Sequence, residues 1–196
     1  MARPRMIVVA GPPGSGKTRS FPVSAFGVDG FNIDDRCAQI LGSYPAIPRD
    51  VRRAVAKECE RFVLDHIERA RSFAVETTLR TSAAIDQAVL AQRSGFVADM
   101  HFVATDSIAE NVARVLQRAQ AGGHGASERE IRAIHHASIA NLAAAIDSFD
   151  PCSRLRLDGK VVAAPARRCR TRGSRRSLRR HARVARGSTW REVKPK

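Results

Sequence analysis

Short apolar segments alternate with longer segments of helical periodicity along residues 1–150 of the chain. The short segments predict strands at 6–10, 31–35, 72–75 and 96–104. In the longer segments apolar residues recur every three or four positions, which predicts helices at 49–71, 82–94, 107–121 and 127–150. The charged side chains of the helix at 49–71 are expected to be solvated. Strands that alternate with helices predict an α/β fold, a parallel sheet flanked by helices.

The loop after the first strand carries the most specific motif. Residues 11–18 read GPPGSGKT and fit the pattern G-x-x-x-x-G-K-[ST] of phosphate-binding loops. The glycines let the backbone N–H groups surround phosphate oxygens, and a helix that begins near Gly16 points its positive end at them. A Gly-Pro turn that matches by chance is the alternative. Contacts to a nucleoside triphosphate are expected from Gly11, Pro12, Pro13, Gly14, Ser15, Gly16, Lys17, Thr18 and Arg19.

Two residues of this loop have distinct expected roles. Lys17 carries the positive charge that would reach the terminal phosphates of the nucleotide. The hydroxyl of Thr18 would bind Mg²⁺. The loop therefore predicts ATP and Mg²⁺ as cofactors, while the acceptor of any phosphate must be inferred from other segments.

Carboxylates follow the second predicted strand at the point where it ends. Asp34 and Asp35 lie there, and a carboxylate at a strand end could meet a substrate hydroxyl or the shell of a Mg²⁺ ion. The alternative is that the pair opens a helix. Both are candidate substrate contacts, and Asp34 is the stronger candidate because it lies nearer the end of the strand.

The third predicted strand runs into the segment 76–80, which reads ETTLR. Glu76 could accept hydrogen bonds from substrate hydroxyls, and Arg80 could hold a phosphate with two parallel hydrogen bonds. The alternative is a strand-to-helix cap made by Thr81 or Ser82, with Arg80 in solvent.

A glycine-rich break at 122–125 separates two predicted helices that carry Arg118 and Arg132. Ser127 and Glu130 have the spacing of a capping box at the start of the second helix. A mobile basic flap of this kind could bring an arginine onto a phosphoryl group and exclude water. An ordinary helical hairpin with surface arginines explains the spacing equally well.

Charge is distributed unevenly along the chain, whose net charge is +15. Residues 1–150 hold 18 basic and 17 acidic residues, whereas 151–196 hold 16 and 2. We expect a P-loop domain over 1–150, a small hairpin over 151–164 and a disordered, arginine-rich tail over 165–196. The net charge of +14 after residue 150 would permit nucleic-acid contacts that do not depend on base sequence.

The cysteines and the hydropathy pattern predict a cytoplasmic protein. Cys37, Cys59, Cys152 and Cys169 form no C-x-x-C pair, so neither a zinc site nor a redox motif is expected. No apolar run is long enough to span a membrane, and the apolar run near the N-terminus is too short for a signal peptide. Reduced thiols and no membrane contact are therefore expected.

Six segments, in their order along the chain, resemble the zeta-toxin kinases and their broader relatives over residues 5–147. They are 11–18, 32–35 (NIDD), 76–80 (ETTLR), 114–118, 122–124 (GGH) and 138–142 (SIANL). The first is shared by many proteins, whereas the ETTLR and GGH segments are more specific. The resemblance implies a P-loop kinase with a parallel sheet, phosphorylation of a hydroxyl on UDP-N-acetylglucosamine by ATP, and an antitoxin protein as a partner.

The resemblance also implies roles for the matched residues. Lys17 and Thr18 would hold ATP and Mg²⁺, and Asp34 would be the base that takes the hydroxyl proton. The sugar nucleotide would be held by Glu76, Thr78 and Arg80. Arg118 would stabilise the transferred phosphate.

The sequence departs from the family pattern before the SIANL segment. Many relatives have arginines and a tyrosine where this chain has Ile134, His135 and Ala137, so a second phosphate-sensing arginine is missing unless Arg132 replaces it. The main hypothesis is a kinase of UDP-N-acetylglucosamine or another small polar metabolite. Two alternatives stay open: a nucleic-acid-binding protein that acts through its basic tail, and a nucleotide binder without turnover.

Overall fold

The computed structural model describes residues 2–42, 47–123, 125–150, 154–157 and 160–163 of the chain. Its elements in chain order are β1 (Arg5–Ala10), α1 (Lys17–Ser20), the 3₁₀ helix η1 (Val23–Phe26), β2 (Asp29–Asn32), α2 (Ile33–Leu41), α3 (Arg49–Glu68), β3 (Phe73–Thr77), α4 (Ala83–Arg93), β4 (Val97–Ala104), α5 (Ile108–Gln120), α6 (Glu128–Ser148), β5 (Arg154–Leu157) and β6 (Lys160–Ala163). The strands form one sheet in the order β2-β3-β1-β4-β5-β6. Neighbours from β2 to β5 are parallel, and β6 is antiparallel to β5. The predicted α/β class is therefore confirmed.

The centre of the sheet is β1, which lies between β3 and β4. Every residue from 6 to 10 has an exposure of 1 % or less, so this strand is buried on both faces. Large aromatic side chains, among them Phe73, Phe96 and Phe102, form the core around it. Burial on both faces explains why β1 reads as a continuous apolar run and not as an alternating one.

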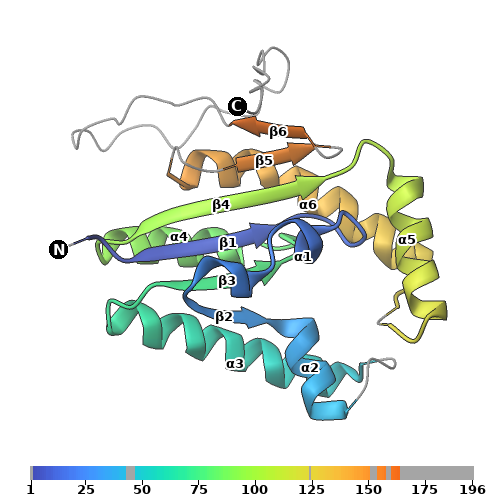
Figure 1. Cartoon of the computed structure of the whole chain (residues 1–196), viewed down its shortest axis with the longest axis horizontal. Coiled ribbons are helices and arrows are strands. Elements are labelled where there is room, and N and C mark those ends of the chain that lie inside the picture. Colours follow the sequence, from blue (N-terminus) through green and yellow to red (C-terminus); the bar gives the residue numbers. More distant parts are fainter. Residues whose placement is uncertain (1, 43–46, 124, 151–153, 158–159, 164–196) are drawn as a thin grey trace.

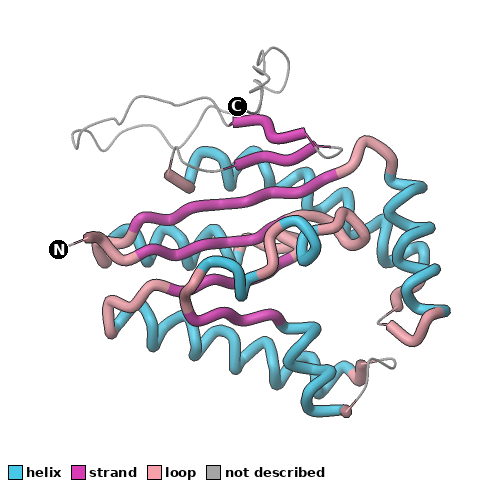
Figure 2. The backbone as a smooth tube through the Cα atoms, viewed as in Figure 1, coloured by secondary structure: helices cyan, strands magenta, loops and turns pink. Residues whose placement is uncertain are grey.

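Helices cover both faces of the sheet, and the parallel strands all end on one side of the molecule. In Figure 1, α4 and α6 lie behind the sheet and α1 and η1 lie in front of it. The arrowheads of β1 to β5 point toward the side where α2 begins and where α5 lies. Figure 2 shows the loops that leave the strands on this side. Parallel α/β sheets bind their ligands at this end.

The second strand is shorter than the sequence predicts. It ends at Asn32, whose Oδ1 accepts hydrogen bonds from the backbone N–H groups of Asp34 at 2.9 Å and Asp35 at 3.4 Å. The prediction of a strand over 31–35 is therefore wrong, because Asn32 caps a helix and both aspartates lie in its first turn. Negative charge in that turn complements the positive end of the helix.

Other predicted boundaries agree within a few residues. Ser127 and Glu130 form the expected capping box of α6. Gly95 follows α4 with a φ angle of +91°, a conformation that favours glycine. The helix expected over 49–71 ends at Glu68. None of the helices in the described ranges has both the length and the apolar character that crossing a membrane requires.

Several expectations fall on residues that the structure does not describe. The two strands of the expected hairpin are β5 and β6, which pair antiparallel, but their turn at 158–159 lies outside the described residues. The same holds for the tail over 165–196, for His124, and for Cys152 and Cys169. Cys37 and Cys59 are free thiols, as expected.

Candidate active site

The loop between β1 and α1 is a tight turn that depends on glycine. Gly11, Gly14 and Gly16 have positive φ angles of +139°, +76° and +86°, which other residues rarely adopt. A β-carbon on Gly11 would lie 2.0 Å from the carbonyl oxygen of Val103. A β-carbon on Gly14 would lie 2.5 Å from the carbonyl oxygen of Asn111. The loop is thus pressed against the end of β4 and the start of α5, where only glycine fits.

Lys17 opens α1 and folds its side chain back over the loop. The residue is buried, and its Nζ donates a hydrogen bond to the carbonyl oxygen of Pro12 at 3.1 Å. Burial lowers the pKa of the Lys17 ammonium, while the carboxylates of Glu76 and Asp34 oppose this shift. The Arg118 guanidinium lowers the Lys17 pKa further. Charged groups from β3, α2 and α5 therefore all lie within electrostatic range of this lysine.

Glu76, near the end of β3, is bonded directly to the loop. The hydroxyl of Thr18 donates to its carboxylate, with Oγ1 2.9 Å from Oε2 and 3.1 Å from Oε1. Burial raises the pKa of the Glu76 carboxyl, which Lys17 and the hydrogen bond from Thr18 counteract. The carboxylates of Asp34 and Asp35 are close enough to raise it further. Hydroxyl and carboxylate oxygens therefore gather beside the loop, and these are the ligands that Mg²⁺ prefers.

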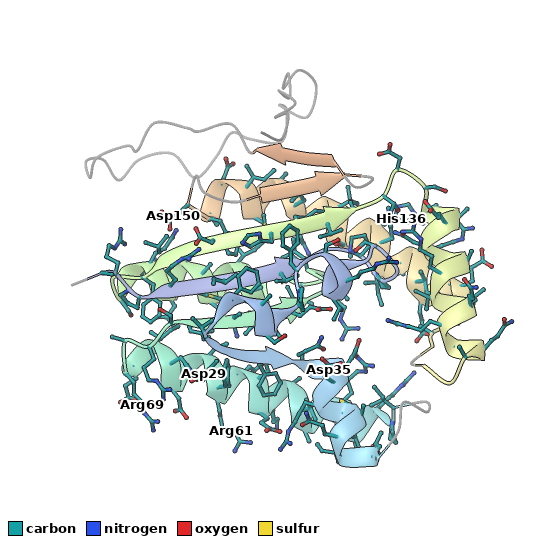
Figure 3. The ribbon with its side chains drawn as sticks, viewed as in Figure 1. Asp29, Asp35, Arg61, Arg69, His136 and Asp150 are labelled. Carbon is teal, nitrogen blue, oxygen red and sulfur yellow. The ribbon has the colours of Figure 1, made fainter. Side chains whose placement is uncertain are left out.

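Asp34 makes an ion pair that the sequence did not indicate. Its Oδ1 lies 3.1 Å from Nη1 of Arg52, in the first turn of α3. The expectation that the charges of this helix are merely solvated is wrong for Arg52, because α2 and α3 pack together. Figure 3 shows Asp35, the neighbour of Asp34, at the start of α2 on the side where the parallel strands end.

Two arginines of α5 face the loop. Arg114 donates from Nη1 to the carbonyl oxygen of Gly14 at 3.4 Å and forms an ion pair with Glu110 one turn earlier. Arg118 is exposed and lies close enough to Lys17 to affect its pKa. The candidate phosphate-stabilising arginine is therefore on the same side of the sheet as the loop.

The glycine break after α5 joins two helices that share a small core. Val112 and Val115 of α5 pack with Ile131 of α6. A β-carbon on Gly123 would lie 2.6 Å from Cγ of Arg118, so the break packs closely on that side chain. The arrangement is a helical hairpin, and the basic flap that would close over a phosphoryl group stays a prediction.

The segment after β3 has an unusual backbone that two side chains hold in place. Leu79 is fully buried and has a φ angle of +55°, a costly conformation for leucine. Its N–H donates to Oγ1 of Thr77 at 3.1 Å, and its carbonyl oxygen accepts from Nδ2 of Asn141 at 3.0 Å. The half-buried Thr78 and the exposed Arg80 flank this residue. Within the described ranges, no hydrogen bond or ion pair connects Arg80 to the loop at Lys17.

An open pocket of about 800 Å³ lies beside the loop. Its size falls in the range typical of ligand sites. It opens between the loop, the end of β4 and the first turns of α5, on the side of β1 where β4 lies. It is lined by Gly14, Ser15, Gly16, Arg19, Ser20, Val103, Ala104, Thr105, Glu110 and Arg114.

Arg132, the expected substitute for the second phosphate-sensing arginine, forms an ion pair within its own helix. Arg132 pairs with Glu128 one turn earlier on α6, and both side chains are largely exposed. Ile134 and His135 are partly buried in the same helix. The structure therefore shows no contact between Arg132 and the phosphate-binding loop among the described residues.

Comparison with models of protein families finds no match, and a search of curated proteins finds none. Solved structures do match. A candidate kinase from Chloroflexus aurantiacus is 18% identical, with a TM-score of 0.54 over 68% of this chain and 79% of that one. A structure from the PezAT toxin–antitoxin system of Streptococcus pneumoniae is 15% identical, with a TM-score of 0.57 over 81% and 70%.

A third match is AvrRxo1-ORF1:-ORF2 with ATP, at 18% identity and a TM-score of 0.58. It covers 82% of this chain, which spans 57% of that longer one. This chain shares the α/β fold of these structures. In a parallel α/β sheet, the loop over 11–18 and the ends of β2, β3 and β4 surround one crevice, at the end of the sheet where ligands bind.

Sequence reasoning gave no structural role to three residues, although two of them, Asn32 and Asn141, lie in the segments that resemble the zeta-toxin kinases. The role of Asn32 could have been found, because Asn followed by two carboxylates is a readable helix start. The roles of Arg52 and Asn141 could not, because each meets its partner only when segments far apart in the chain pack together. The fold thus supplies contacts that no local pattern records.

Proposed function

We propose that the protein is an ATP-dependent phosphotransferase that moves the γ-phosphate of ATP to a hydroxyl of a small polar acceptor. UDP-N-acetylglucosamine is the first acceptor to test. The observation that carries the proposal is the hydrogen bond from Thr18, in the glycine-shaped loop, to the Glu76 carboxylate, with Asp34 and Arg118 close enough to act on Lys17. A carboxylate base, a second carboxylate and two cations in one crevice are the groups that phosphoryl transfer to an alcohol requires.

ATP would bind with its phosphates in the loop and its nucleoside in the adjoining pocket. The buried Oγ of Ser15 has no hydrogen-bond partner among the described residues, and a phosphate oxygen would supply one. Lys17 Nζ, bonded to a carbonyl oxygen of the same loop, would turn to the phosphates. Arg19 and Arg114 line the pocket and would balance phosphate charge.

The donor atoms beside the loop fit Mg²⁺. No group of three His, Cys, Asp or Glu side chains within the described ranges could hold a metal ion alone. Mg²⁺ commonly uses few protein ligands and takes the rest from water and substrate phosphates, so Thr18 with Glu76 nearby is sufficient. Bound there, the ion would neutralise charge on the phosphates.

Asp34 would act as general base. It would take the proton of the acceptor hydroxyl as that oxygen bonds to the γ-phosphorus, while the bond from this phosphorus to the β–γ bridging oxygen breaks and ADP leaves. Lys17 and Arg118 would stabilise charge on the transferred group. The acceptor hydroxyls would be held by Asp35, Glu76 and Thr78. Arg80 would bind a phosphate of the acceptor at the exposed edge of the site.

The test is transfer of labelled γ-phosphate from ATP to UDP-N-acetylglucosamine and to a panel of polar metabolites, with Mg²⁺ present. Asp34→Asn should lower kcat by about 10²–10⁴-fold and leave ATP binding intact. Lys17→Ala should abolish transfer and weaken ATP binding. Lys57→Ala, on the exposed side of α3, is the control. Full turnover by Asp34→Asn would remove this residue from the mechanism, and ATP binding without any acceptor would favour a binder without turnover.

Partners and location belong to the same proposal. One matched structure comes from a toxin–antitoxin system, so an antitoxin that covers this crevice is a candidate partner, and a cytoplasmic location supplies ATP. Contact of the basic residues after 150 with nucleic acid is the rival function. Removal of residues 165–196 separates the two, because a kinase keeps its turnover and a tail-dependent nucleic-acid binder loses its main activity.

A further inference from the structure

Asp34 is held from two sides. Its backbone N–H is bonded to the capping side chain of Asn32 at 2.9 Å, and its Oδ1 is bonded to Nη1 of Arg52 at 3.1 Å. Its other carboxylate oxygen, Oδ2, has no hydrogen bond to any residue that the structure describes. The backbone N–H and Oδ1 of Asp34 thus have partners, while its Oδ2 remains available to a ligand.

Arg52 is well supported at this position. It lies in the first turn of α3, where its N–H donates to the carbonyl oxygen of Pro48 at 3.0 Å. Its side chain is 31% exposed, so the cation is partly shielded from solvent. The pKa of Glu130 on α6 is lowered chiefly by hydrogen bonds from Ser127, and to a smaller extent by Arg52. Arg52 is therefore located between the start of α2 and the start of α6.

A general base works only if its free oxygen is aimed at the proton that it removes. An aspartate on a helix can rotate about two side-chain bonds, and an error of about 1 Å in its position can cost about 10²-fold in rate. A cation bonded to one carboxylate oxygen removes much of this freedom. The arrangement around Asp34 is of this kind.

We infer that Arg52 is the positioning residue of the phosphotransfer site: it binds Oδ1 of Asp34 and thereby directs Oδ2 toward the acceptor hydroxyl. The inference rests on the proposed function, in which Asp34 takes the hydroxyl proton. Because its side chain is bonded to the carboxylate of Asp34, Arg52 would act on the reaction through this residue.

A double-mutant cycle tests the inference. The two measured reactions are γ-phosphate transfer to UDP-N-acetylglucosamine and hydrolysis of ATP to ADP and phosphate. Arg52→Gln should lower kcat about 10- to 100-fold, with the KM for ATP within about twofold of the wild type. In the Asp34→Asn background the same substitution should have no further effect, because the base is already absent. Arg53→Gln, the exposed neighbour on α3, should leave both reactions unchanged.

Rescue separates positioning from a purely structural role. Guanidinium ion added to Arg52→Ala should restore part of kcat, and Arg52→Lys should keep more activity than Arg52→Gln, because the observed contact uses a single nitrogen. Melting temperatures of all variants identify any that unfold.

Three results would overturn the inference. The first is equal kcat for Arg52→Gln and Arg53→Gln. The second is a further fall in kcat of about 10- to 100-fold when Arg52→Gln is added to Asp34→Asn. The third is wild-type protein that neither transfers phosphate nor hydrolyses ATP, which would overturn the proposed function and this inference with it. The first two leave the proposed function standing, so the failures are distinguishable.

Discussion

The two halves of the crevice are built differently. The half that we propose binds the nucleotide, the nucleotide half, is one continuous segment, 11–18, in which three glycines with positive φ angles shape the backbone. The half that we propose binds the acceptor, the acceptor half, gathers side chains from β3, α2, α3 and α5 and depends on contacts between residues far apart in the chain. Backbone conformation defines the first half, and helix packing defines the second.

This difference determines how each half responds to substitution. In the loop, an added carbon atom meets backbone that cannot move without displacing β4 or α5. In the acceptor half, a lost contact changes the orientation of one side chain and leaves the rest in place. Substitutions in the loop should therefore remove binding, whereas those in the acceptor half should weaken individual kinetic steps.

Among substitutions that leave the catalytic side chains in place, Gly14→Ala should have a large effect. The new methyl group would lie 2.5 Å from the carbonyl oxygen of Asn111, and the φ angle of +76° is already unfavourable for alanine. Strain of about 1–3 kcal/mol would weaken ATP binding roughly 10- to 100-fold, which titration calorimetry measures.

Gly27→Ala is the matched control for that substitution. Gly27 also has a positive φ angle, +66°, but a β-carbon there meets nothing within 4 Å. It should therefore lower stability and leave ATP affinity unchanged. Equal loss of affinity in both variants would mean that a general loss of stability, and not the clash of the loop with α5, weakens ATP binding.

The same contrast explains what the sequence could reveal. The loop over 11–18 was predictable because its pattern is local and β1 before it is a continuous apolar run. The start of α2 at Ile33 is not predicted, because the strand signal of Phe31 and Ile33 outweighs the cap at Asn32. Arg52 was interpreted as a surface charge because no pattern within α3 distinguishes it from Arg53.

Asn141→Leu should have an intermediate effect. It removes the donor to the carbonyl oxygen of Leu79, whose left-handed conformation shapes the segment that carries Thr78 and Arg80. The loss of a partly buried hydrogen bond costs about 1–3 kcal/mol. We expect a roughly tenfold rise in the KM for the acceptor and little change in ATP affinity, measured by steady-state kinetics. Asn141→Asp, which has no donor at this atom, should behave alike; normal kinetics in both would show that the segment needs no such support.

Glu76→Gln should have the smallest effect, on the stability of the ligand-free protein. Burial raises the pKa of the Glu76 carboxyl from its ordinary value of 4.5, so the ionised form is less favourable in the folded than in the unfolded chain. The wild-type protein should therefore lose stability as pH rises through the folded pKa, and the variant should not. Its melting temperature should exceed that of the wild type at about pH 7, and the difference should disappear as the pH falls well below the ordinary value of 4.5, where the carboxyl is protonated in both states.

The same melting temperatures show which effect of the Glu76 charge is larger: the cost of burying it or its attraction to the Lys17 ammonium. Gln can still accept the hydrogen bond from Thr18, so the substitution removes charge and little else. Glu60→Gln, exposed on α3, should show no such pH dependence. A Glu76→Gln variant that melts below the wild type at about pH 7 would mean that the attraction between Glu76 and the buried Lys17 ammonium outweighs the cost of burying the carboxylate. In that case the two halves of the crevice are coupled through one ion pair, and the acceptor half contributes to the shape of the nucleotide half.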